Sequence, residues 1–373
     1  MKQPMFLCAL GAVCLGVALQ LSSGPFRPVA LALTTLTAGV AVWAALLAQR
    51  KHRALPAGAV LGAGFLLGIY CHLFALPTPD ADALRLQGFR GLALMTLVFG
   101  SAYLCLHLRG SLQRARFAAV LACFLAMGLA VLQLSPAPAA APAPVDLRYL
   151  GLLALAGAGW AIGRLGGATG EVAALFLLFT GRSFAVIDEA WSDALVVAAL
   201  AAAALLIARP PKRVPPWLVI GLTAGALAAS RQPSALLVVP LALAIPRGQR
   251  LRAALVAVAL LALGFLWWDP RGLAARFHAG GGEPRFAPGL EPLSLPLLPA
   301  GSLGAVLALV AAAAVLLLAL RGTVTLARAL SGGTAAWLVL VLLAPQTSGG
   351  DAFVGLGLLC VAIAAHARAN ETA

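Results

Sequence analysis

Long apolar runs alternate with short polar stretches along the whole chain. A helix that crosses a bilayer needs roughly 20 predominantly apolar residues, and loop charge marks the boundaries between such helices. Candidate helices are expected at 5–21, 28–48, 55–75, 91–107, 117–134, 149–165, 168–186, 192–208, 216–230, 234–246, 253–268, 301–320, 331–344 and 352–367. The pattern predicts an all-α fold, a polytopic transmembrane helix bundle of about 14 segments.

One pair of apolar runs is too short to cross a bilayer twice. Trp217–Ala229 and Ser234–Ile245 flank the turn Ser230-Arg231-Gln232-Pro233. The tip of this hairpin, near 217–245, is therefore predicted to stop below the membrane surface. Arg231 would then lie at membrane depth, where a guanidinium needs an anion or a water-filled cavity. Arg231 is a candidate functional residue, and a structural ion pair with a nearby acid is the alternative.

Composition supports a membrane protein. The chain is 62% hydrophobic and 10% charged with a mean hydropathy of +0.99, whereas about a quarter of the residues of a soluble protein are charged. Its net charge of +14 comes from short basic clusters between apolar runs, without a basic face interleaved with aromatic residues. This pattern predicts the lipid bilayer as partner and no nucleic acid.

The basic clusters predict the topology. With the N-terminus in the cytoplasm, the clusters near 50–53, 109–116, 209–213, 247–252 and 321–328 all fall on the cytoplasmic side, as the positive-inside rule requires. Both termini are then cytoplasmic. Nearly all carboxylates map to the outer side: Asp80, Asp82, Asp146, Asp188, Glu189, Asp193, Asp269, Glu283, Glu291 and Asp351. Any polar chemistry is therefore predicted on the outer face.

Pro-rich and charged features concentrate in the later part of the chain. Residues 1–116 are predicted to form N-terminal transmembrane helices, and residues 117–373 a transmembrane core with a long outer loop at 269–300. Ser135–Val145 is a Pro/Ala run that favours extended polyproline II, a stiff spacer leading to Asp146. A loop as long as 269–300 is usually functional or disordered.

Acids and cations on one face suit sugar transfer from a lipid-phosphate donor. That reaction needs a carboxylate to take the acceptor's proton and cations to hold the phosphate, for which arginine's planar fork is well shaped. The candidate bases are Asp146, Asp188, Glu189 and Asp193. The candidate phosphate ligands are Arg231, Arg276, His278 and Arg285, and Gln232 is a further candidate for substrate binding.

Structural roles are open for several of these residues. Asp193 is also placed to cap the helix that begins near 192, and Asp146 is also consistent with a solvated loop. His366 belongs to a cytoplasmic basic end and Glu171 lies near that side, so neither is expected to have a special role. No metal-ligand spacing, nucleotide-binding loop or nucleophile elbow occurs, so the cofactor is unknown and a divalent metal stays open.

Several short motifs follow one another in a recognisable order. An acidic turn, Asp188–Ala194, opens a helix, and after a basic loop comes Gly221–Gln232, a Gly-rich helix ending in Ser-Arg-Gln. Later come Trp268-Asp269-Pro270, then Pro284-Arg285-Phe286 and Leu293-Ser294. This order resembles bacterial polytopic glycosyltransferases of the GT-C fold, mannosyltransferase-like enzymes that use polyprenyl-phosphate sugars. The resemblance covers about residues 117–367.

The resemblance implies a membrane glycosyltransferase of the bacterial cytoplasmic (inner) membrane. It would transfer a sugar from a polyprenyl-phosphate donor to a glycan, lipid or protein acceptor at the periplasmic or exterior face. It assigns Asp146 as the base, Glu189 and Asp193 to the acceptor or a metal, and Arg231, Arg276, His278 and Arg285 to the donor phosphate.

The chain departs from the family pattern at several positions. Arg231 replaces the usual lysine, Ala190 and Ala194 replace a glycine and a proline, and a late signature survives only as Ala352-Phe353. These departures predict a divergent member, active or inactive. The alternatives are a polymerase or ligase of lipid-linked glycans and a non-enzymatic membrane transporter or scaffold.

Overall fold

The computed structural model describes residues 4–21, 26–47, 55–74, 114–134, 147–188, 193–230, 236–267, 302–321, 324–344 and 349–372. Every regular element in this part of the chain is a helix, and no strand occurs in it. The all-α prediction is therefore confirmed for the described residues. The expected segment at 91–107 lies outside them, so the total of about 14 segments stays a prediction.

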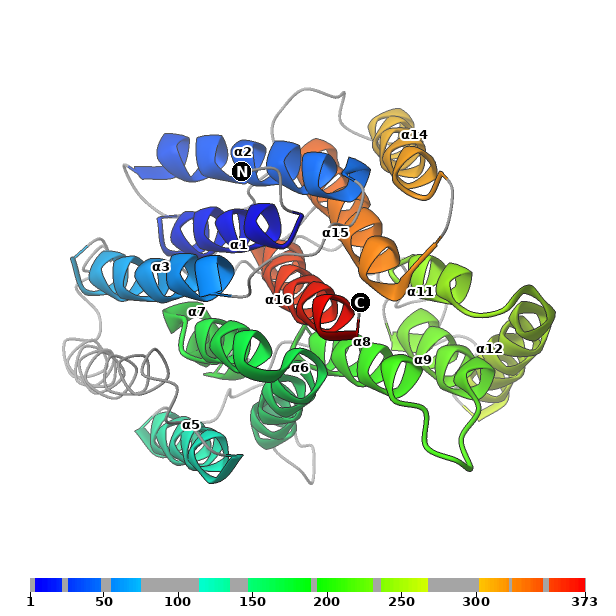
Figure 1. Cartoon of the computed structure of the whole chain (residues 1–373), viewed down its shortest axis with the longest axis horizontal. Coiled ribbons are helices and arrows are strands. Elements are labelled where there is room, and N and C mark those ends of the chain that lie inside the picture. The colour runs from blue at the N-terminus through cyan, green and yellow to red at the C-terminus, as the bar shows by residue number, and fades with distance from the viewer. Residues whose placement is uncertain are drawn as a thin grey trace.

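The described helices form one bundle (Figure 1). The first are α1 (Pro4–Gln20), α2 (Arg27–Leu46), α3 (Leu55–Phe74) and α5 (Arg114–Leu134). The central ones are α6 (Leu147–Leu178), α7 (Gly181–Asp188), α8 (Asp193–Ala208) and α9 (Pro216–Ser230). The last are α11 (Val238–Ala244), α12 (Arg247–Trp267), α14 (Ser302–Ala319), α15 (Leu326–Leu343) and α16 (Gly349–Thr372).

Four described helices are long and apolar enough to cross a membrane. They are Arg27–Leu46, Arg148–Leu178, Leu326–Leu343 and Gly350–Glu371. Several shorter apolar helices accompany them, including α9 with 15 residues and α11 with 7. These helices indicate a membrane protein, and α9 and α11 are both shorter than a full crossing requires.

Helix α6 is a hairpin rather than one rod. Gly167 has a φ of 55°, in the left-handed region that favours glycine, and the chain reverses there. After the reversal, Leu178 lies against Gly159 of the first leg, within 2.5 Å of where a Cβ on that glycine would stand. The predicted break between 149–165 and 168–186 is thus confirmed. The second of these segments is wrong as a single helix, because it is interrupted at Phe179-Thr180 before α7.

Helix α16 forms the centre of the bundle. It packs against α1, α6, α8 and α15 (Figure 1), and every residue from 351 to 367 is buried. A helix that is apolar all round is expected in such a position, because no face needs contact with water.

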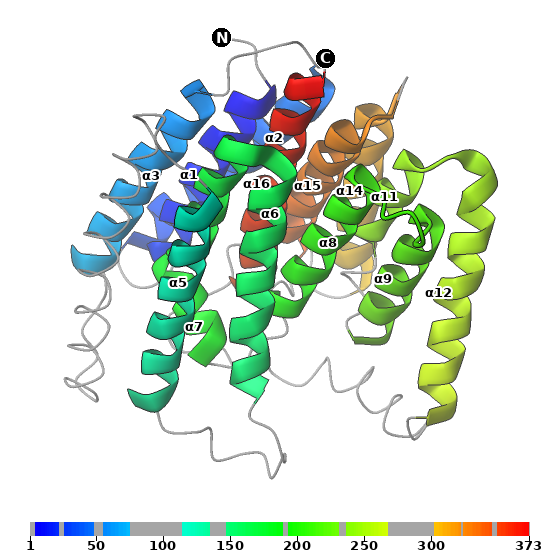
Figure 2. The ribbon, with the colours of Figure 1, turned by 60° about the horizontal axis from the view of Figure 1, so that its bottom comes forward.

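Three helices begin side by side. A Cβ on Gly151, near the start of α6, would lie 3.9 Å from Ala194 at the start of α8. Further along, Gly357 of α16 contacts Val197 of α8, and the Arg368 guanidinium donates to the Ala208 carbonyl oxygen at 2.9 Å. The first leg of α6, α8 and α16 therefore run parallel. We call the end where they begin the distal end (Figure 2).

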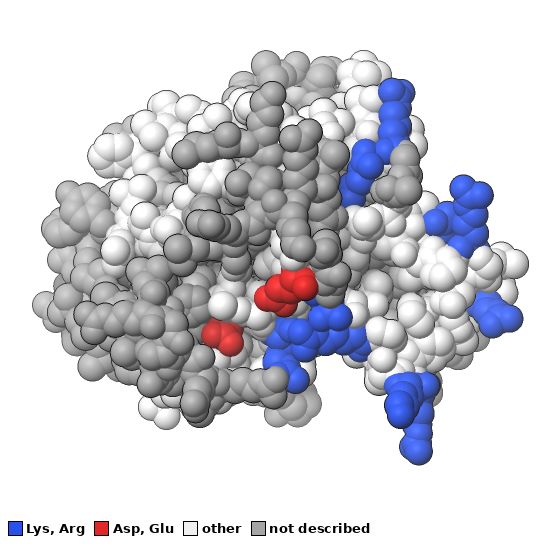
Figure 3. All heavy atoms as spheres, in the orientation of Figure 1, with Lys and Arg blue, Asp and Glu red and all other residues white. Residues whose placement is uncertain are grey.

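The opposite end of the bundle carries the chain termini (Figure 2), and we call it the basic end. The connections from α8 to α9, from α11 to α12 and from α14 to α15 also lie here. Their exposed residues include Arg209, Lys212, Arg213, Arg247 and Arg321. Figure 3 shows Lys and Arg gathered on this face. The cytoplasmic assignment of this end stays a prediction, favoured by the positive-inside rule.

Close approach of α6 and α16 gives a first stability prediction. A Cβ on Gly166 would lie 2.6 Å from the Ala364 Cα, which is backbone and cannot move aside easily. We expect Gly166→Ala to destabilise the protein by about 1–3 kcal/mol, measured as a lower melting temperature in detergent. Gly157→Ala on the same helix is the control, since a Cβ there meets nothing within 4 Å. Equal melting temperatures for the two variants would contradict the tight contact.

Candidate functional site

Two of the candidate site residues lie in the described part of the chain, and the first of them, Asp188, is the last residue of α7. The second, Asp193, is the first residue of α8 and is 3% exposed. The others lie outside the described residues: Asp146, Glu189, Arg231, Gln232, Arg276, His278 and Arg285. The structure therefore leaves their mutual arrangement untested, and the site must be built from Asp193 outward.

Asp193 belongs to a group of buried charges at the distal end. Arg148, in the first turn of α6, is 4% exposed, and Asp351, in the first turn of α16, is 9% exposed. Among the Lys, Arg, Asp and Glu side chains whose burial the structure describes, these three alone are buried. We call Arg148, Asp193 and Asp351 the distal charge cluster. Its three residues lie in the first turns of the three parallel helices.

The electrostatics of the distal charge cluster differ between its members. Asp193 and Asp351 occupy helix N-termini, where the helix dipole favours negative charge. Arg148 also occupies an N-terminus, so the dipole of α6 opposes its charge, and burial adds a desolvation cost. A guanidinium in this position requires anionic neighbours, and all three residues interact with their surroundings. Guanidinium and helix N-termini together can hold a phosphate, while the carboxylates can accept a proton.

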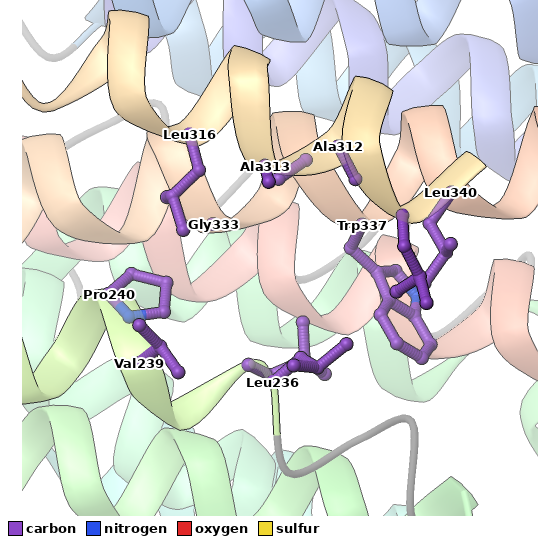
Figure 4. A pocket seen from close by; sticks show the side chains of 12 residues that line it. Leu236, Val239, Pro240, Ala312, Ala313, Leu316, Gly333, Trp337 and Leu340 are labelled. Carbon is purple, nitrogen blue, oxygen red and sulfur yellow. The ribbon is translucent and has the colours of Figure 1, made fainter. Parts of the chain in front are cut away.

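An apolar cavity of about 320 Å³ lies between α11, α14 and α15. Its twelve lining residues are all apolar or aromatic, and Figure 4 shows Pro240, Ala313 and Trp337 facing it from these helices and Leu236 from the turn before α11. The size and lining suit a hydrocarbon ligand.

A hydrogen bond connects the cavity with the distal charge cluster. Trp337 lines the cavity, and its Nε1 donates to the Asp351 carbonyl oxygen at 2.8 Å. Asp351 opens α16, whose start lies beside the start of α8 and thus beside Asp193. The apolar wall of the cavity therefore adjoins the first turn of a helix that carries a buried charge.

Comparisons with known proteins add nothing to this geometry. No family model, curated protein or solved structure matches the chain. The resemblance to GT-C glycosyltransferases stays a prediction from the short motifs. Among the described residues, no group of three or more His, Cys, Asp and Glu lies close enough to hold a metal ion.

A buried polar network at the basic end was not predicted from the sequence. His366 was expected to be part of a basic surface, yet it is 3% exposed. Its Nε2 lies 2.7 Å from the Ser331 Oγ, and the Cys8 Sγ lies 3.8 Å from the same oxygen. The network joins α16, α15 and α1. The assignment failed because His366 lies on the side of α16 that α15 covers, which loop charge alone does not reveal.

The polar network gives a second stability prediction. Ser331→Ala removes the hydroxyl that both the His366 ring and the Cys8 thiol contact, leaving a buried ring nitrogen without this partner. We expect a loss of about 1–2 kcal/mol, measured by thermal unfolding in detergent. Thr35→Ala is the control, because the exposed Thr35 hydroxyl bonds only within its own helix, to the Leu31 carbonyl oxygen. A Ser331→Ala shift no larger than the control's would contradict a stabilising network.

Proposed function

We propose that this chain is a membrane glycosyltransferase that transfers a sugar from a polyprenyl-phosphate donor to a glycan, lipid or protein acceptor. The reaction would take place at the distal end, on the periplasmic or exterior face of a bacterial cytoplasmic membrane. Such a donor is a long hydrocarbon with a charged head. A protein that binds it needs an apolar groove next to groups that attract phosphate.

The observation that carries this proposal is the hydrogen bond from Trp337, which lines the apolar cavity, to the backbone of Asp351 in the distal charge cluster. The cavity offers an isoprenoid chain an apolar space of about 320 Å³. Trp337 forms part of its wall and bonds to the Asp351 carbonyl oxygen. An isoprenoid in the cavity would thus bring its phosphate toward the helix starts that carry Arg148 and Asp193.

The helix ends that adjoin the proposed site residues in the sequence lie at the same end of the bundle, which supports the proposal. The segment with Asp146 joins the end of α5 to the start of α6, and the segment with Glu189 joins α7 to α8. Arg231 and Gln232 follow the end of α9, and Arg276, His278 and Arg285 follow the end of α12. These described helix ends all point to the distal end (Figure 2).

The proposed chemistry is a single displacement at the sugar. The Asp146 carboxylate takes a proton from the acceptor hydroxyl, and the acceptor oxygen forms a bond to the anomeric carbon. The bond between that carbon and the phosphate oxygen breaks, and polyprenyl phosphate leaves with the electron pair. Arg231, Arg276, His278 and Arg285 stabilise the charge on the leaving phosphate. Glu189 and Asp193 position the acceptor, directly or through a metal ion.

A donor assay tests the proposal. The purified chain is incubated with membrane lipid extract as acceptor and with polyprenyl-phosphate mannose labelled in the sugar. Transfer of label together with release of polyprenyl phosphate is the expected result. Turnover only with a diphosphate-linked oligosaccharide would instead identify a polymerase or ligase. Binding or movement of lipid without transfer would identify a transporter or scaffold and contradict the enzyme.

A further inference from the structure

A second cavity lies at the basic end, far along the bundle from the distal charge cluster. It has a volume of about 400 Å³ and lies between α5 and the turn of the α6 hairpin, next to the end of α8. Unlike the first cavity, it has both charged and apolar walls. Arg164, Glu171 and Arg209 supply the charges. We call it the basic-end pocket.

The charges around the basic-end pocket are predominantly positive. Besides the two arginines and Glu171 that line it, the Glu371 carboxylate comes near Gly167, with Oε1 3.0 Å from where a Cβ would stand. Arg368 bonds to the Ala208 carbonyl oxygen, next to Arg209. The arginines of this group outnumber the carboxylates by one. A single negative charge on a ligand would balance them.

The other wall of the pocket suits contact with lipid. It is formed by Phe117, Leu121 and Trp160, and Trp160 is 50% exposed. An amphipathic indole at a helix end is typical of the level where lipid headgroups meet hydrocarbon. Arg164 lies one helical turn closer to the basic end on the same leg of α6. Along the axis of the bundle, the pocket therefore presents the Trp160 ring first and then, closer to the basic end, the Arg164 guanidinium.

We propose that the basic-end pocket binds the headgroup of an anionic phospholipid, such as phosphatidylglycerol, from the adjacent leaflet. The phosphodiester lies between the Arg164 and Arg209 guanidiniums, which are well shaped for two phosphate oxygens. The start of the acyl chains packs against Trp160 and Leu121. Basic pockets between transmembrane helices are general binding places for such headgroups. This ligand is separate from the proposed donor and does not depend on it.

Thermal unfolding with added lipid tests this site. The full chain is purified in a neutral detergent, and its melting temperature is followed as phosphatidylglycerol is titrated into the micelles. A saturable rise is expected for the wild type. Arg164→Gln should raise the half-saturating lipid fraction about fivefold, as expected for one arginine near a lipid phosphate. Trp160→Ala, which leaves every charge in place, should raise it as well.

Arg252→Gln is the matched control, because Arg252 is exposed near the start of α12, also at the basic end, and does not line the pocket. Its half-saturation should equal that of the wild type. Equal effects of Arg164→Gln and Arg252→Gln would overturn the proposal in favour of diffuse surface charge. A matching rise with phosphatidylcholine, or with inorganic phosphate alone, would overturn it too. The first result would exclude selectivity for anionic lipid, and the second would identify free phosphate as the ligand.

Discussion

An Asp146→Asn substitution is expected to lower the sugar-transfer rate by about a thousandfold, because a positioned general base contributes roughly two to four orders of magnitude. Asparagine keeps the size of the side chain but cannot accept the acceptor's proton. Asp146 directly precedes α6, whose start adjoins the distal charge cluster. Label transfer from a polyprenyl-phosphate sugar is the measurement, with donor binding followed in parallel. Donor affinity should stay within about twofold, since the loss concerns the chemical step.

Two further variants make the Asp146 experiment decisive. Asp82→Asn, in another predicted outer loop, is the control and should transfer sugar at the wild-type rate. Asp193→Asn is the contrast: Asp193 is buried in the first turn of α8, so its loss should lower the melting temperature as well as activity. Wild-type transfer by Asp146→Asn would exclude this residue as the base. A collapse of transfer with Asp82→Asn would reassign the base to that loop.

The apolar runs of the sequence predicted helix positions correctly where a helix is apolar along its whole length. The expected segments 5–21 and 192–208 correspond to α1 (Pro4–Gln20) and α8 (Asp193–Ala208). The prediction was less accurate where polar residues continue a helix. Helix α12 begins at Arg247 rather than 253, and α15 begins at Leu326 rather than 331.

Local capping explains the early start of α15. The Thr325 side chain accepts a hydrogen bond from the Arg328 backbone N–H at 3.3 Å, so the helix begins in the basic stretch ahead of the apolar run. A criterion based on apolarity alone cannot detect such a start. By contrast, the break at Gly167 was located correctly, because Gly166 and Gly167 interrupt two apolar runs.

The site was less predictable because it depends on which helices become neighbours. Arg148 is a lone charge at the start of a predicted apolar segment, and that signal was available in the sequence. Its meaning depends on Asp193 and Asp351, which are distant in sequence and share its end of the bundle only because α6, α8 and α16 run parallel. Glu171 was expected to have no special role near the cytoplasmic side, whereas it lines the basic-end pocket with Arg164 and Arg209. Which helices pack against each other cannot be read from the hydrophobic periodicity of a single sequence.

Blocking the apolar cavity should reduce donor binding strongly. Ala313 of α14 is exposed and faces the cavity (Figure 4), so Ala313→Trp would put an indole into a space of about 320 Å³. An isoprenoid chain would lose the burial of at least two methylenes, each contributing about 0.8 kcal/mol, which corresponds to an affinity about tenfold lower. Farnesyl phosphate is a suitable soluble probe. Its dissociation constant can be measured by calorimetry in detergent.

Ala314→Trp provides the matched control for this experiment. Ala314 is the next residue of α14 and is also exposed, but it does not line the cavity. Both variants add the same aromatic surface to the same helix, so both should melt within about 2 °C of the wild type, as expected for surface changes of up to 0.5 kcal/mol. Only Ala313→Trp should weaken farnesyl phosphate binding. Equal affinity in the two variants would show that the hydrocarbon of the donor binds elsewhere, and the cavity would lose its part in the proposed function.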